Sequence, residues 1–449
     1  MSDWQNRYRQ KLISAEDAAK LVRSGNRMYW GLAHGAAFDF DAAVAQRVHE
    51  LQGVQVYSTL PMRRGPFATY TAAASAGEVQ FNSCHFGGPE RKMAKDKGCW
   101  FVPIQFRELP KYWRENVPVF DLTVAQVGPM DAFGNFNLGP QVADFWGVID
   151  NSRCVIVEVN ENMPFAHGHQ VSLPLNRVDY IIEGSNPPLV EVPPVEPTEI
   201  EVRMAKNIVG MIEDGSTLQL GIGGIPNTIG SLLCSAGIGD LSVHTEMLVD
   251  AYVDLYNAGK ITGNKRMDKG KMVYSFCGGT RKLYDFIDGN PVCCCGPVDY
   301  VNDIGVISQN EKMISINSCL QVDLYGQVSA ESAGYRQISG TGGQLDFVLG
   351  AFLSKGGKSF LCTPSARRRP DGTLESLIVP AMPAGTVVTT PRSATQYVVT
   401  EYGIVNLKGK SSWDRAELLI SIAHPEVRDA LIREAEKMGI WTRSGRIPE

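Results

Sequence analysis

The sequence predicts an α/β fold with two tandem domains, each a mainly parallel sheet flanked by helices. Its 449 residues exceed what one compact core usually contains, which favours two domains. Segments with helical periodicity alternate with short apolar segments in both halves. Residues 154–159 and 180–182 are nearly continuous apolar runs, which are typical of strands buried on both faces of a parallel sheet.

A proline-rich segment marks the expected domain boundary. Residues 186–197 contain five prolines, which exclude helix and disfavour a central strand. The sequence therefore predicts an N-terminal α/β domain over 1–186, an extended linker over 187–198 and a C-terminal α/β domain over 199–449.

In the first half, Ser-Ala-Glu-Asp at 14–17 resembles a capping box and predicts a helix that ends at Gly25. Strands over 27–31 and 54–57 and a helix near 40–51 follow. The second half repeats this alternation. It predicts strands over 217–220 and 241–245, helices over 199–213, 226–236, 247–258 and 347–353, and two final helices, one from near Ser411 and one from Pro425 to Gly439.

The composition narrows the possible functions. Hydrophobic residues make up 44% of the chain and charged residues 20%, and the net charge of -5 gives no general basic field for nucleic acid. No apolar run reaches the roughly 18 residues of a membrane span, and the N-terminal segment lacks the apolar core of a signal peptide. We therefore expect a cytoplasmic protein that binds neither membrane nor nucleic acid.

Ten cysteines form no C-x-x-C pair. In the consecutive run 293–295, neighbouring side chains diverge and cannot converge on one zinc ion. We expect buried, reduced thiols and no metal site, with a metal or redox role as the alternative.

The most informative residue is Glu246, which ends the strand predicted over 241–245. It follows a glycine loop, Gly-Ile-Gly-Gly-Ile-Pro-Asn at 221–227, that leaves one strand and opens a helix. Glycines let a ligand approach the backbone, and the helix N-terminus offers oriented N–H groups. The loop is no dinucleotide fingerprint, because Pro226 stands where glycine is required. A tight turn without function is the alternative.

A second glycine loop at 339–343 precedes the helix at 347–353. Two such loops in one domain fit a ligand with several phosphates.

The Gly-Gly-Lys-Ser segment at 356–359 lacks the first glycine of a phosphate-binding loop, so we expect Lys358 to be exposed. The segment Ala-Glu-Ser-Ala-Gly at 330–334 differs at one residue from the Gly-x-Ser-x-Gly nucleophile elbow, and no obvious Asp and His follow Ser332 in the order of a hydrolase. Glu331 is a second candidate carboxylate, and His244 either orients Glu246 or packs beside it.

These motifs, taken in order, resemble the acetyl-CoA hydrolase/transferase family, above all its butyryl-CoA:acetate and 4-hydroxybutyrate CoA-transferases. The resemblance covers nearly the whole chain and includes the segments at 157–164, 221–227, 244–247, 330–334, 339–347 and 400–407. It implies CoA-transferase-like domains with the active site between them, and ping-pong transfer through a glutamyl-CoA thioester.

The resemblance assigns roles residue by residue. Glu246 takes the place of the nucleophile. The first CoA loop comprises Gly223, Gly224, Ile225, Pro226 and Asn227, and the second comprises Gly342, Gly343 and Gln344. Coenzyme A then enters as the acyl-CoA co-substrate, with a carboxylic acid as the other partner and no permanently bound cofactor. A homodimer or higher homo-oligomer is expected.

The chemistry agrees with these roles. An ionised carboxylate, with a reference pKa of about 4.3, needs no general base to attack a thioester. Attack by Glu246 gives an acyl-glutamyl anhydride and CoA thiolate, and the thiolate then forms the glutamyl-CoA thioester and releases the acid. Backbone N–H groups of Gly223 and Gly224 are candidates to stabilise each oxyanion, and losing one such donor typically costs about 3–4 kcal/mol.

Three alternatives remain open at this point. An acyl-CoA hydrolase would use the same intermediate and differ only in the access of water. A transferase for a dicarboxylate such as succinate or itaconate is favoured if Arg63 or Arg64 reaches the acyl pocket, although surface positions are the simpler expectation for both. The segments at 31–36 and 61–65 also match the family poorly, so residues 55–67 and His34 could signal a different acid. A non-catalytic CoA sensor would keep the loops without needing Glu246.

Overall fold

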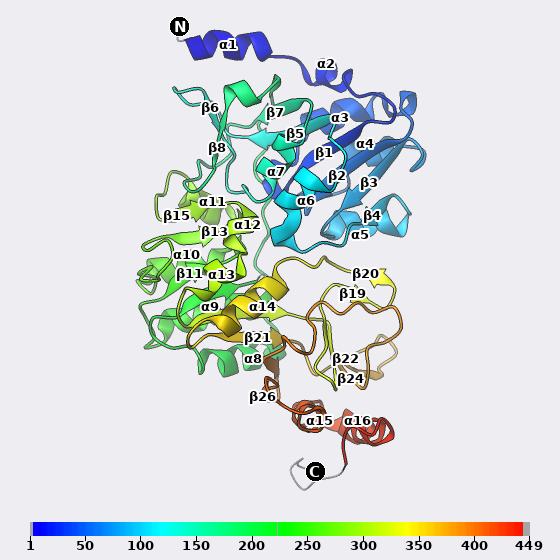
Figure 1. The fold of residues 1–449 in the computed structure, drawn as a ribbon, viewed down its shortest axis with the longest axis vertical. Coiled ribbons are helices and arrows are strands. Elements are labelled where there is room, and N and C mark those ends of the chain that lie inside the picture. The colour runs from blue at the N-terminus through cyan, green and yellow to red at the C-terminus, as the bar shows by residue number, and fades with distance from the viewer. Residues whose placement is uncertain (1–2, 222, 443–449) are drawn as a thin grey trace. The chain divides into compact units, whose positions relative to one another are not determined.

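A computed structural model describes residues 3–221 and 223–442. The chain forms two compact units (Figure 1). Unit 1 contains the chain up to Val192 together with Glu246–Leu248 and Val273–Val301. Unit 2 contains Pro193–Thr245, Val249–Met272 and the chain from Asn302 onward. Glu246 thus belongs to unit 1, whereas both predicted CoA loops belong to unit 2.

Unit 1 is built on a seven-stranded parallel sheet in the order β4-β3-β2-β1-β5-β7-β9. The strands are β1 (Arg27–Leu32), β2 (Val54–Thr59), β3 (Val79–Ser83), β4 (Cys99–Phe101), β5 (Leu122–Val127), β7 (Val155–Val159) and β9 (Tyr180–Glu183). The chain runs outward in both directions from the centre of this sheet. The carboxyl ends of β1 and β5 therefore flank the switch point where α/β sheets commonly bind ligands.

Alternating side chains of β1 reach opposite faces of this sheet. Met28 and Trp30 pack in one cluster with residues of α2 (Ala15–Ala19) and α3 (Asp39–Ala45). Tyr29 packs edge-on against Trp113 of α6 (Leu109–Glu115), with ring centroids 5.7 Å apart. Burial of these apolar and aromatic side chains on both faces stabilises the unit.

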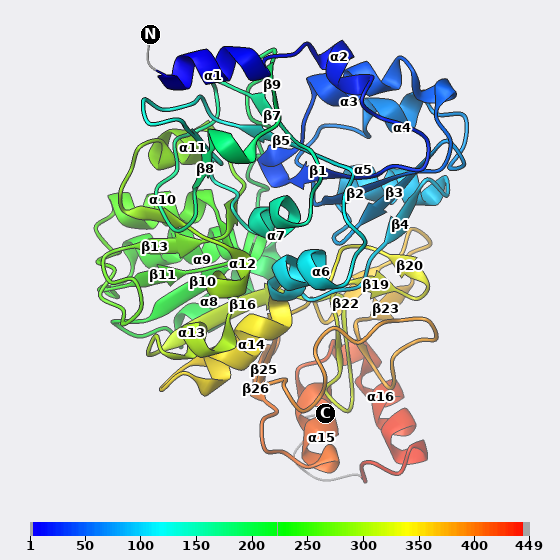
Figure 2. The same ribbon diagram turned by 45° about the horizontal axis from the view of Figure 1, so that its top comes forward.

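Unit 2 contains the parallel strand order β11-β10-β16-β21-β25, to which β26 adds an antiparallel edge (Figure 2). The strands are β10 (Thr217–Leu220), β11 (Ser242–His244), β16 (Met313–Ser318), β21 (Lys358–Cys362), β25 (Tyr397–Thr400) and β26 (Gly403–Asn406). The main helices are α8 (Glu199–Val209), α9 (Gly224–Ser235), α10 (Asp250–Asn257), α14 (Gln344–Leu353), α15 (Ser412–Ser421) and α16 (Pro425–Lys437). One core cluster joins Leu361 and Val398 of the sheet to Leu419 and Leu431 of the two final helices.

Shorter elements complete the two units. Those of unit 1 are α1 (Asp3–Lys11), η1 (Ala33–Gly35), η2 (Val48–Glu50), α4 (Ala68–Ala72), α5 (Gly88–Lys95), η3 (Phe106–Glu108), β6 (Asn135–Asn137), α7 (Phe145–Asp150), β8 (Ser172–Pro174), η4 (Leu175–Arg177), β12 (Met247–Leu248), β14 (Phe276–Cys277), α11 (Arg281–Ile287), β15 (Cys293–Cys295) and α12 (Val298–Val301), together with most of β13 (Met272–Tyr274). Those of unit 2 are α13 (Ile304–Ser308), β17 (Gln321–Asp323), β18 (Val328–Ser329), β19 (Ser332–Ala333), β20 (Arg336–Gln337), β22 (Ala366–Arg368), β23 (Leu374–Ser376) and β24 (Ile378–Val379).

The predicted α/β class, with mainly parallel sheets flanked by helices, is confirmed. Several predicted ends were wrong. The helix expected to reach Gly25 stops at Ala19, and the one expected over 40–51 ends at Ala45 and is followed by a 3₁₀ turn. The helix expected from 247 begins at Asp250, because the two residues of β12 pair with β14 instead.

The domain boundaries predicted at 186/187 and 198/199 stay predictions. Residues 184–198 contain neither helix nor strand, in keeping with their prolines. Within the part of the chain that the structure describes, no helix has the length and apolar character needed to cross a bilayer.

Candidate active site

The main chain of Glu246 is held by backbone hydrogen bonds within unit 1. Its carbonyl accepts from the N–H groups of Ser275, at 2.9 Å, and Phe276, at 3.2 Å. The next two residues form β12, which pairs in parallel with β14, and Gln141 forms an antiparallel bridge to Phe276. The position of this half-buried glutamate is therefore set by strand pairing with a segment about thirty residues further along the chain.

The first glycine loop joins β10 to α9 in unit 2. Gly223 caps α9 with φ of 115°, a conformation that L side chains rarely adopt, so glycine is required here. Gly224, Ile225, Pro226 and Asn227 form the first turn of the helix, where the first N–H groups of any α-helix lack intrahelical partners. Ile222, the second residue of the predicted loop, lies outside the described residues.

A carboxylate from α8 lies against the start of α9. A Cβ atom on Gly224, the third glycine of the loop, would meet the carboxyl group of Glu201 at 2.5 Å, so any larger residue here would force that side chain to shift. Glu201 also accepts hydrogen bonds from the backbone N–H and hydroxyl of Thr198, at 2.8 and 2.9 Å, and completes a capping box. The Thr-x-x-Glu spacing would have predicted this cap, although not its contact with the loop.

The second glycine loop is anchored by Glu331. This buried carboxylate accepts from the hydroxyl of Thr341 in the loop, at 3.1 Å, and from the hydroxyl of Thr389, at 3.0 Å. Its backbone carbonyl accepts from the N–H groups of Ile338 and Ser339. Glu331 therefore organises the loop, a role that no local sequence signal indicated because the partners lie 10 and 58 residues away.

Gln344 opens α14 directly after this loop. Its side-chain amide donates to the carbonyl of Ser318, at the end of β16, over 3.1 Å, and its Oε1 atom accepts from the hydroxyl of Thr390 at 3.1 Å. Gly342 precedes it with φ of 55°, and Gly343 caps the helix. The second loop is thus connected to the carboxyl end of the central sheet.

A hollow of about 630 Å³, which we call the α8 hollow, lies in unit 2. Its wall contains Ser318, Cys362 and Glu401 from the carboxyl ends of β16, β21 and β25, together with Ile225 from the first loop. Ligands of open α/β sheets commonly bind at this edge. Of the predicted CoA-loop residues, Ile225 lines the hollow and Gln344 bonds to its wall.

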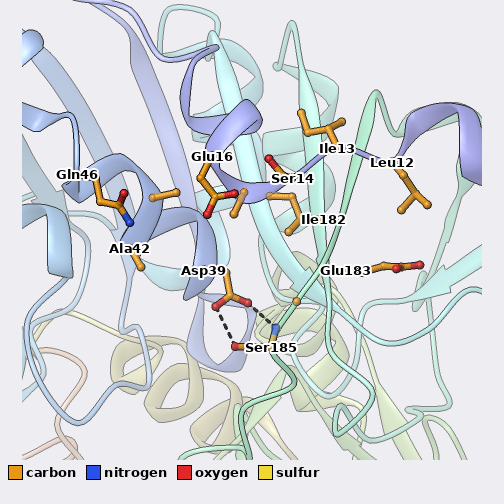
Figure 3. A pocket seen from close by; sticks show the side chains of 13 residues that line it. Leu12, Ile13, Ser14, Glu16, Asp39, Ala42, Gln46, Ile182, Glu183 and Ser185 are labelled. Atoms are coloured by element: carbon orange, nitrogen blue, oxygen red, sulfur yellow. Dashed lines mark hydrogen bonds between the residues drawn. The ribbon is translucent and has the colours of Figure 1, made fainter.

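Another hollow, of about 680 Å³, lies in unit 1 beside α2 and α3 (Figure 3). Asp39 points toward Ser185 there and accepts hydrogen bonds from its backbone N–H and its hydroxyl, at 2.5 and 2.9 Å. None of the predicted site residues lines this hollow.

Two residues predicted to lie at the surface instead form ion pairs with carboxylates. Lys358 begins β21, donates to Glu213 at 2.7 Å and to the carbonyl of Met211 at 3.1 Å, and is only 20% exposed. Arg63 is 9% exposed and pairs with the buried Asp41 at 2.7 Å. Both predictions of a surface position were wrong, whereas Arg64 is exposed as expected. Because Asp41 already neutralises Arg63, this arginine does not provide an anion clamp for a dicarboxylate.

The contacts of the remaining candidate site residues indicate structural roles. Ser332 lies in the short antiparallel pair β19–β20 and its hydroxyl accepts from the N–H of Val387, which is not the strand-to-helix turn of a nucleophile elbow. His244 is buried and packs against Phe347. All ten cysteines are free and most are buried, and burial raises the pKa of Cys293 to about 12, which keeps this thiol protonated.

Comparison with known proteins matches both parts of the chain to one family. The N-terminal domain of acetyl-CoA hydrolase/transferase matches residues 1–193, and the C-terminal domain of the same family matches residues 279–435. A butyryl-CoA:acetate CoA-transferase from Anaerostipes caccae is 45% identical, over 98% of this chain and 99% of the relative. A 4-hydroxybutyrate coenzyme A transferase from Clostridium kluyveri is 38% identical, over 97% and 99%.

The fold gives the same result. The crystal structure of RipA from Yersinia pestis superimposes with a TM-score of 0.88 at 33% sequence identity, over 98% of this chain and 100% of RipA. Full-length likeness in sequence and in structure shows that the chain belongs to the acetyl-CoA hydrolase/transferase family.

Proposed function

We propose that the protein is a CoA-transferase that moves coenzyme A between a short-chain acyl-CoA, butyryl or 4-hydroxybutyryl, and acetate. The observation that carries this proposal is the arrangement at the carboxyl edge of the unit 2 sheet. There the first glycine loop leaves β10, the second is tied to the end of β16 by Gln344, and β11 ends two residues before Glu246. The names of the full-length relatives from Anaerostipes and Clostridium support the acyl and acceptor classes.

In the proposed reaction the Glu246 carboxylate attacks the thioester carbonyl. The C–S bond breaks, CoA leaves as the thiolate, and an acyl-glutamyl anhydride forms. The thiolate then attacks the glutamyl carbonyl, which releases the free acid and leaves the glutamyl-CoA thioester. Acetate reverses both steps and departs as acetyl-CoA, so no water is consumed and the thioester energy is conserved.

The glycine loops have two proposed tasks. Each tetrahedral oxyanion needs preorganised donors, and the first-turn amides at Gly223 and Gly224 are proposed to supply them. The second loop, with Gly342, Gly343 and Gln344, is proposed to bind the nucleotide part of coenzyme A together with Ile225, Pro226 and Asn227. Binding energy from this remote part of the substrate would hold the thioester in a reactive position.

Trapping the intermediate tests the proposal directly. The protein is mixed with butyryl-CoA without acceptor, digested and analysed by mass spectrometry for a CoA adduct on the peptide that contains Glu246. We expect the adduct in the natural protein and its absence in Glu246→Gln. Turnover by Glu246→Gln, or an adduct elsewhere, would disprove the assignment and favour a protein that only binds coenzyme A.

Product analysis separates transfer from hydrolysis. Butyryl-CoA is incubated with and without acetate, and acetyl-CoA and free CoA are quantified. Acetyl-CoA that forms only with acetate supports transfer. Release of CoA at the same rate without acetate would instead indicate a hydrolase that uses the same glutamyl thioester.

The predicted homodimer or higher homo-oligomer stays a proposal and is measured by light scattering.

A further inference from the structure

The carboxyl end of β1, at the switch point of unit 1, contains a buried histidine. The η1 turn places His34 against Tyr284, with ring centroids 5.0 Å apart in an edge arrangement, and leaves His34 only 3% exposed. Burial lowers the pKa of His34 to about 3, so the imidazole is neutral at physiological pH. The sequence had marked this histidine as a departure from the family that could signal a different acid.

The Nε2 atom of His34 is buried and has no hydrogen-bond partner among the described residues. A neighbouring group shares this condition. The side chain of Gln141 lies next to the same turn, 3.6 Å from where a Cβ of Gly35 would stand. Its Nε2 atom donates to the carbonyl of Leu138 at 2.7 Å, which fixes the amide, and its buried Oε1 atom finds no partner within the described part of the chain. Unpaired buried polar atoms are rare in native proteins and call for an explanation such as a bound ligand.

These two polar atoms belong to the same part of unit 1 as the main chain of the nucleophile. Gln141 bridges to Phe276, whose N–H donates to the carbonyl of Glu246. On the other side of η1, the carbonyl of Ala33 accepts from the N–H of Met62 at 3.0 Å.

Two methionine side chains lie in the same part of unit 1. A Cβ on Gly278 would meet the terminal methyl of Met247 at 2.2 Å and that of Met62 at 2.7 Å, so both thioether side chains converge on this glycine. Methionine side chains repack at small cost. Two adaptable methionine side chains and two fixed polar atoms without partners among the described residues suit a short chain with one polar substituent.

Building on the proposed transfer reaction, we propose that His34 determines acyl specificity by binding the hydroxyl of a short, uncharged hydroxyacyl group. A hydroxyl both donates and accepts, so it pairs with Nε2 of a neutral imidazole in either tautomer. When Nε2 carries the proton, the hydroxyl accepts from it and can donate its own proton to Oε1 of Gln141. A second carboxylate would need a cation here, and Arg63 is already paired with Asp41. A plain alkyl chain would leave both polar atoms unpaired.

Two thioesters of the same size test this role. 4-Hydroxybutyryl-CoA and valeryl-CoA differ only in a terminal hydroxyl or methyl, and kcat/KM is measured for each with acetate as acceptor. We expect the natural protein to prefer the hydroxyacyl thioester by about 10-fold or more, because a site built to bind a hydroxyl discriminates against the analogue that lacks it. His34→Phe should remove this preference by lowering only the hydroxyacyl value.

Further variants keep the test independent of folding. His34→Gln retains a hydrogen-bonding group and should keep part of the preference. His85→Phe is the matched control, because His85 follows β3, two strands away from β1 in the sheet, and this change should leave both values unaltered. Equal losses with both thioesters in His34→Phe, or a natural protein that prefers valeryl-CoA, would overturn the role of His34.

Formation of the CoA adduct on Glu246 shows whether only the role of His34 fails or whether the proposed transfer reaction fails as well. If the adduct forms with both thioesters at equal rates, the assignment of His34 fails while the transfer reaction stands. If neither thioester gives an adduct, the proposed function itself fails and takes this inference with it.

Discussion

Oε2 of Glu331 accepts a hydrogen bond from the hydroxyl of Thr341 at 3.1 Å, which ties the second glycine loop to a buried carboxylate. The other carboxylate oxygen, Oε1, accepts from the hydroxyl of Thr389 at 3.0 Å. One side chain thus joins the loop to a segment 48 residues beyond it, and we interpret this as preorganisation of the proposed CoA site.

Thr341→Val should raise KM for acyl-CoA by about fivefold with little change in kcat, because a lost hydrogen bond of this kind costs at least about 1 kcal/mol. Steady-state kinetics with butyryl-CoA measures this. Thr389→Val breaks the bond to the other oxygen and the bond that the Thr389 hydroxyl accepts from the N–H of Ala330, and should lower the melting temperature with a smaller effect on KM. Equal KM effects in the two variants would contradict a specific role for the loop contact.

Gly223→Ala should lower turnover by at least about tenfold, because φ of 115° is strained for alanine and the first turn of α9 would shift by enough to misplace its amides. Gly237→Ala is the control: it lies in the same unit, with nothing within 4 Å of its added methyl and no positive φ. Full activity of Gly223→Ala would show that the loop amides do not stabilise the oxyanion.

A buried carboxylate should give unit 1 an unusual pH dependence. Asp144 accepts from the hydroxyl of Tyr29 at 2.9 Å and from Nε1 of Trp113 at 2.7 Å, yet its burial raises its pKa from 3.8 to about 6. The folded state therefore binds the proton more tightly than the unfolded chain. The stabilisation is complete below pH 3.8 and is lost as the pH rises through about 6, which amounts to about 3 kcal/mol.

Chemical unfolding followed by tryptophan fluorescence measures this effect, since Trp113 itself bonds to the carboxylate. Asp144→Asn keeps an acceptor for Trp113 and should show a smaller fall in the free energy of unfolding between pH 4 and 7 than the natural protein does. Parallel pH profiles for the two proteins would refute the assignment to Asp144.

Arg63→Met should destabilise unit 1 by about 3–5 kcal/mol, because the carboxylate of Asp41 would remain buried without its cation. The rings of Phe38 and Phe67, each 4.5 Å from the guanidinium carbon, would also lose a contact. The relative rates with different acyl-CoA substrates should not change. Arg64→Met, at an exposed position, should alter stability by less than about 0.5 kcal/mol. A change of acyl preference in Arg63→Met would restore this arginine as a substrate-binding group.

The sequence by itself determined the fold class, the order of strands and helices around both glycine loops, and the family. These features depend on local signals: apolar periodicity, glycine at a turn with positive φ, and a capping residue such as Ser14, whose side chain accepts from the N–H of Asp17. The same local signals did not place the start of α10 or the end of α2. Pairing with β14 and the turns that follow α2 override helix propensity there.

Only the tertiary structure decided the surroundings of the candidate site. Glu246 is held by Ser275 and Phe276, Thr341 by Glu331, and Arg63 by Asp41, and in each pair the partners are distant in sequence. A hydrogen bond between such residues leaves no periodic trace in the chain, because its cause is the packing of whole elements. The burial that leaves the imidazole of His34 neutral, with its Nε2 atom lacking a hydrogen-bond partner among the described residues, arises in the same way, since exclusion of water depends on every neighbour at once.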